Sequence, residues 1–252
     1  MIVGNGRPNG HITPCEQCPL RRRTNLREFT AEELRFVKQF KIDELRVEPG
    51  ASFLREGARS EHLYTVLRGW AFRYKMLDDG RRQILNYALP ADMVGLQGAV
   101  MREMEHSVEA LTPLTLCVFP RGKLWGLYAQ FPSLGFDITW LAAHEERLID
   151  EHLLSLGRRT AIERTAFILL HLFTRAEECG LTKDGAVHFP FTQQHLADSL
   201  GMSLVHTNKT LKRLYTTNAV RWRGRIFELL DRAVLAALAG ENVRPDVRRP
   251  FI

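Results

Sequence analysis

The chain of 252 residues carries a formal net charge of +6 and has a sequence pI of about 9.3. Its 45% hydrophobic and 25% charged residues are values of a globular protein with one large domain or two ordinary ones. No apolar run approaches the roughly 18 residues of a membrane span, and no apolar signal core begins the chain, so we expect a cytoplasmic protein outside the membrane. The positive charge favours an acidic partner such as nucleic acid.

Residues 1–29 are polar and interrupted by glycine and proline, which is typical of a loosely ordered leader. The leader contains a Cys-x-x-Cys pair, Cys15 and Cys18, and the rest of the chain adds Cys117 and Cys179. Four cysteines in a chain of this length do not make a disulfide framework, so reduced thiols or a metal site fit better. Cys179 falls at a helix end and is interpreted as structural or incidental.

Residues 30–131 predict a domain rich in short β-strands. Thr30 and Glu33 form a capping-box pattern at the start of a helix. The alternating runs that follow, from about Leu45 to Phe119, are separated by turn signals. Asp79-Gly80 is the best hairpin signal, because glycine tolerates a positive φ. Many short strands at regular spacing indicate a sandwich or barrel.

Residues 132–157 change to a helical period, with Pro132 and the cap candidate Ser133 at the start. Apolar side chains recur at heptad spacing, which has two interpretations. The stripe is either a coiled-coil seam between two copies of the chain or the face of an amphipathic helix packed on its own domain. Three heptads are too short to decide from the pattern alone. The candidate seam residues are Leu141, Ala142, Leu148, Ile149 and Leu156.

Residues 158–240 predict a second domain with a helix-turn-helix pattern. After a helix closed by Gly180 and a short strand, the segment FTQQHLADSLGMSLVHTNKTLKRL shows two short helical patterns joined by Gly201. Thr192 and Ser203 can cap these helices through their hydroxyl oxygens. Two short helices joined by a tight turn with glycine are the pattern of a DNA-binding helix-turn-helix.

The charge of this second domain has one sign over a long interval. No Asp or Glu lies between Asp198 and Glu228, whereas six Lys and Arg residues do. A basic hairpin that turns at Arg223-Gly224 would form a wing along a nucleic-acid backbone. The alternative is an ordinary solvated basic surface. Residues 241–252, rich in proline and arginine, are expected to form a mobile tail.

The second helix of the motif separates into two faces when projected at about 100° per residue. Thr207, Leu211 and Leu214 would pack on the first helix. The opposite face carries base-reading chemistry, because Asn can pair with adenine, Lys can donate to guanine, and Val can contact a thymine methyl. Hydroxyl, imidazole and guanidinium groups beside it suit phosphate. The candidate DNA-binding residues are Ser203, Val205, His206, Asn208, Lys209, Lys212, Arg213 and Arg223.

Taken in this order, the motifs resemble the CRP/FNR family of transcription regulators over residues 30–230. The stretches EPGASFLREG and LYTVLRGWAFRYKMLDDGRRQILNYALPADMVGLQG resemble its sensory jelly-roll barrel of the cyclic-nucleotide-binding type. The heptad helix resembles its dimerisation helix, and the acid-free segment with VRWRGRIFEL resembles its winged helix-turn-helix. The resemblance implies an α+β fold of these three parts. It also implies a homodimer that binds a pseudo-palindromic site in double-stranded DNA and acts with RNA polymerase.

Two departures from the family pattern are informative. Cyclic-nucleotide binders follow a glycine with Glu and place Arg before Ser, whereas this chain has Gly95-Leu96-Gln97 and His106-Ser107. Leucine cannot accept a hydrogen bond from ribose, and histidine is a poorer phosphate clamp than arginine. We therefore expect no cyclic nucleotide to bind. Val205 and Lys209 stand where many relatives carry Glu and Arg, so the half-site should differ from the common one.

The FNR branch of the family holds an oxygen-sensitive iron–sulfur cluster through three leader cysteines and one barrel cysteine. Cys15, Cys18 and Cys117 match three of these positions, but the third leader cysteine is missing near Thr24. A cubane cluster normally needs four protein ligands, although His11 could substitute. We expect no cofactor and no metal site, and an iron–sulfur cluster, zinc or thiol redox chemistry at these cysteines are the alternatives.

The sequence thus predicts a homodimeric DNA-binding transcription regulator that senses a signal through its barrel or leader cysteines. No nucleophile–base pair and no phosphate-cradling glycine loop is evident, so no enzymatic activity is expected. A cupin-type metal enzyme would need closely spaced barrel histidines, whereas His62 and His106 are far apart in the sequence. A ligand-binding barrel protein without a DNA function is the other alternative, and the acid-free basic segment argues against it.

Overall fold

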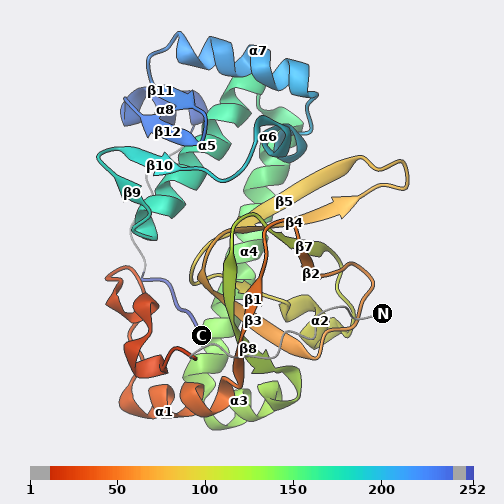
Figure 1. Ribbon diagram of the computed structural model, residues 1–252, viewed down its shortest axis with the longest axis vertical. Helices are drawn as coiled ribbons and strands as arrows, with labels where there is room; N and C mark the ends of the chain where they lie inside the picture. Colours follow the sequence, from red (N-terminus) through yellow and green to blue (C-terminus); the bar gives the residue numbers. More distant parts are fainter. Residues whose placement is uncertain (1–11, 241–247) are drawn as a thin grey trace.

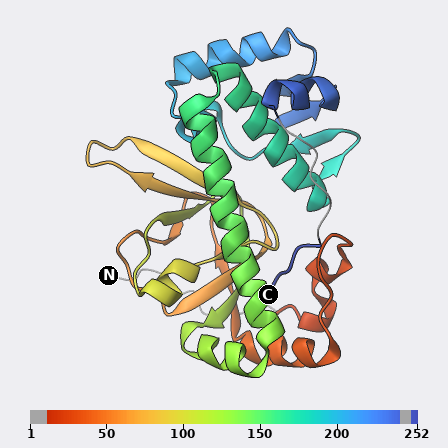
Figure 2. The ribbon, with the colours of Figure 1, turned by 180° about the vertical axis from the view of Figure 1, so that it is seen from behind.

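The computed structural model describes residues 12–240 and 248–252 of the chain. The molecule is elongated, and Figures 1 and 2 show three parts along its length. A domain built on strands (the β-domain, residues 12–131) lies at one end, and a mostly helical domain (the head, residues 161–240) lies at the other. The long helix α4 (Pro132–Arg158) runs between them. None of the helices in the described residues combines the length and the apolarity needed to cross a membrane.

The β-domain contains two four-stranded antiparallel sheets, with strand orders β1-β8-β3-β6 and β2-β7-β4-β5. Side chains from both sheets meet in one apolar cluster, in which Val66, Val108 and Leu116 are completely buried. The two sheets stay open at their edges, so the predicted barrel is a jelly-roll-like sandwich. Its elements are β1 (Asp43–Val47), β2 (Ser52–Leu54), β3 (His62–Arg68), β4 (Ala71–Met76), β5 (Arg82–Ala88), β6 (Met93–Val94), α2 (Leu96–Met101), β7 (Ser107–Ala110) and β8 (Leu114–Pro120).

The hairpin of β4 and β5 turns where the sequence predicts. Gly80 has a φ of +85°, and the amide of Leu77 donates to the carbonyl of Arg81 across the turn. The hairpin projects outward from α4 at the level where the β-domain meets the head (Figure 1). This projection places β5 against the first helix of the helix-turn-helix.

The leader is more ordered than its composition indicates. Short 3-10 helices η1 (Cys15–Gln17) and η2 (Pro19–Arg22) precede α1 (Ala31–Phe40), whose predicted capping box between Thr30 and Glu33 is confirmed. Leu20 and Leu26 are buried beneath them, in a cluster on the outer side of the β1-β8-β3-β6 sheet. The expectation of a loosely ordered leader is therefore wrong for residues 12–29, and residues 1–11 lie outside the described part of the chain.

Helix α4 follows η3 (Arg121–Lys123) and α3 (Leu124–Gln130). Pro132 is its first residue, where a missing amide hydrogen costs nothing. The suggestion that Ser133 caps this helix is wrong, because no side chain caps its start and the Ser133 hydroxyl donates instead to Glu33 Oε1 at 2.6 Å.

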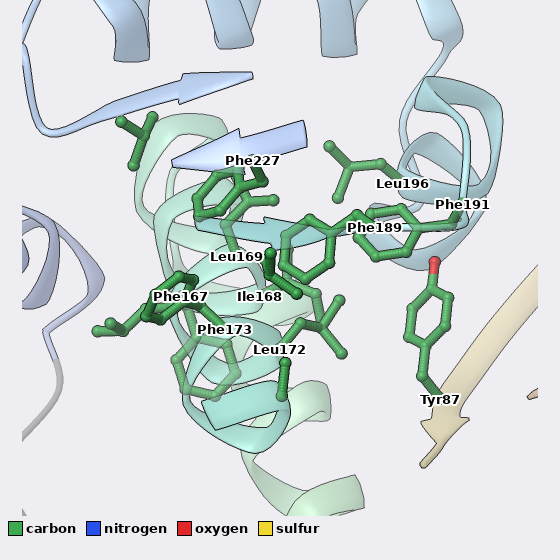
Figure 3. Packing of buried hydrophobic residues seen from close by; sticks show 14 of the residues in the cluster. Tyr87, Phe167, Ile168, Leu169, Leu172, Phe173, Phe189, Phe191, Leu196 and Phe227 are labelled. Carbon is green, nitrogen blue, oxygen red and sulfur yellow. The ribbon is translucent and has the colours of Figure 1, made fainter. Parts of the chain in front are cut away.

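The head packs its helices around a small antiparallel sheet with strand order β11-β12-β10-β9. Three aromatic side chains fill its centre (Figure 3): the ring centroid of Phe189 lies 4.6 Å from that of Phe191 and 4.9 Å from that of Phe227. Its elements are α5 (Ala161–Glu178), β9 (Thr182–Lys183), β10 (Ala186–His188), α6 (Gln193–Leu200), α7 (Leu204–Tyr215), β11 (Val220–Arg223), β12 (Ile226–Leu229) and α8 (Arg232–Ala239).

The apolar core of the head continues into the β-domain. Tyr87 of β5 is fully buried, with its ring centroid 5.0 Å from that of Phe191 and its hydroxyl 3.0 Å from the Ser199 hydroxyl (Figure 3). Trp70 and Phe72 of the β-domain belong to the same cluster. The orientation of the head is therefore fixed by side-chain packing as well as by the chain connection at α4.

The last described residues, 248–252, return to the β-domain and lie beside the leader (Figures 1 and 2). Phe251 and Ile252 are each 4% exposed. The expectation of a mobile tail is wrong for these five residues, and residues 241–247 lie outside the described part of the chain.

Candidate nucleic-acid interface

The helix-turn-helix forms with the caps that the sequence predicts. The Thr192 hydroxyl accepts a hydrogen bond from the His195 amide at the start of α6, and the Ser203 hydroxyl accepts one from the His206 amide, at 3.2 Å, at the start of α7. Gly201 closes α6 in the left-handed conformation with a φ of +59°. A residue with a β-carbon is strained in this conformation, which explains the glycine at the turn.

Helix α7 separates into a buried face and an exposed face as predicted. Thr207, Leu211 and Leu214 are buried, whereas Val205 is 65% exposed and Lys209 is also exposed. Lys212, Arg213 and His206 share the exposed side. This surface offers one apolar contact and several cationic donors on a helix without acids, which is the chemistry that a major-groove reading helix needs.

Asn208 differs from its neighbours on this face. Its side chain is half-buried, and its Oδ1 atom is buried without a hydrogen-bond partner. A buried unpaired amide oxygen is costly, so another contact should compensate it in the bound state. Rotation of the amide outward toward a base edge would satisfy this atom.

The wing forms as the hairpin of β11 and β12, but its arginines are not equivalent. Arg221 pairs with Glu228 across the hairpin, and Arg225 donates to the carbonyl of Pro190. Arg223, beside the turn, has no hydrogen bond or ion pair within residues 12–240 and 248–252. Arg223 is therefore the wing arginine whose guanidinium donors are not used within the described residues.

A contact between the head and the β-domain neutralises the last acid before the basic interval. Arg82 of β5 pairs with Asp198 of α6 at 2.8 Å, and Gln83 donates to the Ser199 carbonyl at 3.0 Å. The carboxylate that precedes the basic interval is thus paired with a cation from the β-domain. Nothing in the sequence indicates this pair, since its two residues are 116 positions apart.

The candidate seam residues of α4 do not share one exposed face. Leu141 is 3% exposed and packs within its own chain, while Leu148 and Leu156 are half-buried. Ala142 and Ile149 are exposed. The exposed apolar side chains of α4 also include Phe136, at 68%, and Leu153, at 68%, neither of which the heptad pattern singled out.

The position that the resemblance matches to the phosphate clamp of cyclic-nucleotide binders contains a buried histidine, His106. Nε2 of His106 accepts a hydrogen bond from Nε of Arg73 at 3.0 Å. Burial, Arg73 and Lys75 lower the pKa of His106 to about 3, so its imidazole is neutral. Arg73 also pairs with Glu145 of α4. The guanidinium is therefore engaged by the chain's own groups, and the sandwich interior beside it is filled by apolar side chains.

The leader cysteines lie close to Cys117, but the site does not fit a cubane cluster. Burial raises the pKa of Cys117 to about 12, and it also raises the pKa values of Cys15 and Cys18. The ammonium of Lys41 lies near these thiols and acts in the opposite direction, because its positive charge lowers their pKa values. In the part of the chain that the structure describes, no three His, Cys, Asp or Glu side chains are arranged to hold a metal ion. His11 lies outside that part.

The geometry defines a class of protein: a winged helix-turn-helix head joined through a long helix to a jelly-roll sensory domain. Each of the two domains matches the model of a known protein family. Residues 44–131 match the cyclic nucleotide-binding domain, and residues 163–238 match the Crp-like helix-turn-helix domain.

Similar proteins make the assignment specific. The chain is 31% identical to the nitrogen fixation regulation protein FixK of Bradyrhizobium diazoefficiens, over 92% of this chain and 95% of that protein. It is 28% identical to the transcriptional activator protein FnrL of Cereibacter sphaeroides, over 90% of this chain and 92% of that protein. The structure of FixK2 from Bradyrhizobium japonicum superposes with a TM-score of 0.72 at 28% identity, covering 79% and 98% of the two chains. This chain belongs to the CRP/FNR family of DNA-binding transcription regulators, on its FNR-like side.

Proposed function

We propose that this protein binds a pseudo-palindromic DNA site as a homodimer in the cytoplasm and regulates transcription together with RNA polymerase, without enzymatic activity. The observation that carries the proposal is the exposed, acid-free face of α7. Val205, Lys209 and Lys212 would contact base edges, joined by Asn208 after rotation of its amide. The phosphate contacts would come from Ser203, His206, Arg213 and Arg223.

The dimer would be formed by the exposed side of α4. Phe136, Ile149 and Leu153 expose large apolar side chains on one long helix, which a second copy of the chain would bury. A two-fold axis along α4 would set the two heads side by side, with half-sites about one helical turn apart. Several relatives are named transcriptional activators, which supports contact with RNA polymerase.

We propose further that the protein holds no resident cofactor. The sandwich interior is packed with apolar side chains, and the His106–Arg73 pair stands where a phosphate clamp would be needed. The leader thiols are protonated by burial, which disfavours them as thiolate ligands. DNA binding would then be controlled by the concentration of the protein or by the contacts between its domains, rather than by a bound nucleotide.

The proposed reading face is tested by a matched pair of lysine variants. An operator is first obtained by selection from random duplexes, and its affinity is compared with that of a scrambled duplex by fluorescence anisotropy. Lys209→Ala should reduce discrimination by about tenfold, because one good base contact contributes ~1–3 kcal/mol. Lys183→Ala, which removes an exposed lysine on β9, should leave discrimination unchanged. Full discrimination in Lys209→Ala would show that α7 does not read bases through this face.

A further inference from the structure

Residues 248–252 form a strap that crosses the leader of the β-domain. The amide of Arg27 donates to the carbonyl of Arg249 at 2.8 Å, and the amide of Arg249 donates to the carbonyl of Asn25 at 2.9 Å. These two bonds make a short parallel bridge between the strap and the leader. Main-chain pairing of this kind fixes the register of the strap as well as its position.

The end of the strap is buried in the β-domain. The ring centroid of Phe251 lies 4.8 Å from that of Phe29, and Ile252 belongs to the apolar cluster that contains Leu20 and Leu26. The hydroxyl of Thr65, a buried residue of β3, donates to the main-chain oxygen of Ile252. The end of the strap is therefore part of the buried core of the β-domain and does not lie on its surface.

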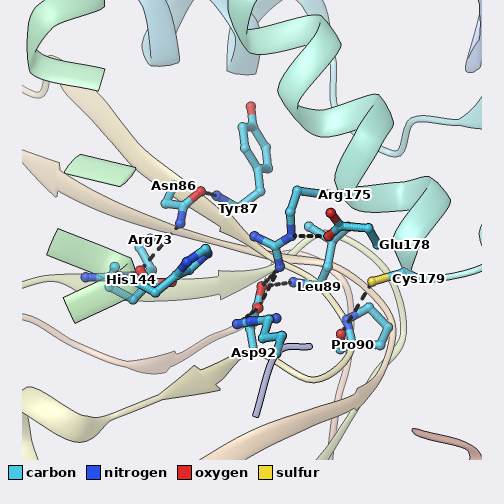
Figure 4. A network of polar contacts seen from close by, with 12 residues as sticks. Arg73, Asn86, Tyr87, Leu89, Pro90, Asp92, His144, Arg175, Glu178 and Cys179 are labelled. Carbon is cyan, nitrogen blue, oxygen red and sulfur yellow. Dashed lines mark hydrogen bonds and ion pairs between the residues drawn. The ribbon is translucent and has the colours of Figure 1, made fainter. Parts of the chain in front are cut away.

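The strap is linked to the head through one buried carboxylate. Asp92, which is 2% exposed, receives Nη2 of Arg249 at 2.5 Å and Nη2 of Arg175 at 2.7 Å. Arg175 belongs to α5 of the head, and Figure 4 shows it reaching down to Asp92. The Leu89 amide donates to the same carboxylate at 2.8 Å. A buried carboxylate that accepts from two guanidinium groups and one amide is held in a fixed orientation, because charge-assisted hydrogen bonds are strong and directional.

The strap follows the head in the chain, so the head is joined to the β-domain at both of its ends. Its beginning continues from α4, and the residues after α8 lead to the strap. In this arrangement the exposed face of α7 is turned away from the β-domain, at the far end of the molecule (Figure 1). When the strap is docked on the β-domain, the exposed face of α7 is therefore not covered by the rest of the chain.

We propose that residues 248–252 position the head for DNA binding, with Arg249 acting through Asp92 on Arg175. The inference rests on the proposed reading role of α7. Release of the strap would let the head sample other orientations, and the apparent affinity would fall in proportion to the fraction of molecules that keep the competent one. Arg249 is a positioning residue in this scheme and contacts no DNA.

The experiment compares Arg249→Ala with Arg248→Ala in the full chain. Arg248 is the exposed neighbour and forms no ion pair within the described residues, so its loss controls for charge. Hydrogen exchange followed by mass spectrometry should show faster exchange near Asn25 and in the second half of α5 for Arg249→Ala only. Operator affinity should fall about tenfold. Arg249→Lys should recover part of it, since an ammonium can still pair with Asp92.

Removal of residues 248–252 provides a second variant, whose affinity should fall at least as far as that of Arg249→Ala. Exchange and affinity in Arg249→Ala that match those of Arg248→Ala would overturn the proposal. Tighter operator binding after strap removal would overturn it too, because the strap would then restrain the head. A failure of the proposed reading role of α7 is distinguished by a separate result. In that case Lys209→Ala would discriminate between operator and scrambled DNA as well as the unaltered chain does, whether or not the strap is docked.

Discussion

Arg73 on β4 donates through Nε to the neutral Nε2 of His106, at 3.0 Å. The same guanidinium pairs with Glu145 of α4, which also accepts a hydrogen bond from Asn86. One side chain thus ties the interior of the sandwich to the long helix.

Replacement of Arg73 by methionine should destabilise the protein. The substitution leaves the buried His106 acceptor without its donor and the partly buried Glu145 carboxylate without its cationic partner, which we expect to cost about 2–3 kcal/mol of unfolding free energy. Urea unfolding followed by circular dichroism measures the loss. Arg68→Met is the matched control, because Arg68 is exposed and should change stability by less than about 0.5 kcal/mol. Equal losses in the two variants would contradict the stabilising role of the pair.

The exposed stripe of α4 makes a second prediction. Ile149→Asp combined with Leu153→Asp should yield folded monomers by light scattering, because both side chains are exposed within one chain and charge there opposes only association. Leu181→Asp, at another exposed leucine in the head, should leave the dimer intact. A persistent dimer in the double variant would place the seam on a different surface. Leu141→Asp should instead unfold the chain, because Leu141 is buried in its own core.

Local signals in the sequence predicted most elements correctly. The capping box at Thr30 and Glu33, the left-handed Gly201 and the hairpin at Gly80 depend on backbone chemistry within a few residues. The two faces of α7 follow from helical periodicity alone. The α+β order of sandwich, long helix and helix-turn-helix was predicted for the same reason, since each part has its own local signature.

What the sequence could not predict depends on residues that are far apart in the chain. Asp92 receives two arginines, Arg175 and Arg249, that lie 83 and 157 positions away, and no local pattern marks either of them. The strap was missed because its composition is typical of a mobile tail. Heptad spacing in α4 likewise cannot distinguish a stripe that is buried within the chain from an exposed one. The candidate seam therefore included both the buried Leu141 and the exposed Ile149.

Stability should fall as the pH drops below about 6.5. Burial, followed by nearby arginines, lowers the pKa values of His144 and His171 to about 3, so both are neutral in the folded chain. The unfolded chain binds a proton at each histidine below about 6.5, so the stabilisation is complete above that pH and is lost progressively toward pH 3. Each of the two histidines lowers the free energy of unfolding by up to about 1.4 kcal/mol for each pH unit in this range.

Urea unfolding at pH 7.5 and pH 5.5 measures this slope. His171→Gln should flatten it, because glutamine does not bind a proton in this range. His188→Gln, at an exposed histidine of β10, should leave the slope as it is. A slope that is the same in both variants would mean that His171 has the same pKa in the folded and the unfolded chain.

The cysteines support a last prediction, made on protein purified without oxygen. Three cysteines whose pKa values are raised by burial are an incomplete donor set for a cubane cluster, which needs four ligands that are usually thiolates. We expect no broad visible absorbance and no stoichiometric iron, sulfide or zinc. The Cys15→Ser variant should have the same affinity for the operator as the unaltered chain, both in air and in the absence of oxygen. Stoichiometric iron and sulfide that disappear in Cys15→Ser would show instead that the leader reorganises around a cluster, with a fourth ligand from residues such as His11. In that event, oxygen should weaken operator binding in the unaltered chain only.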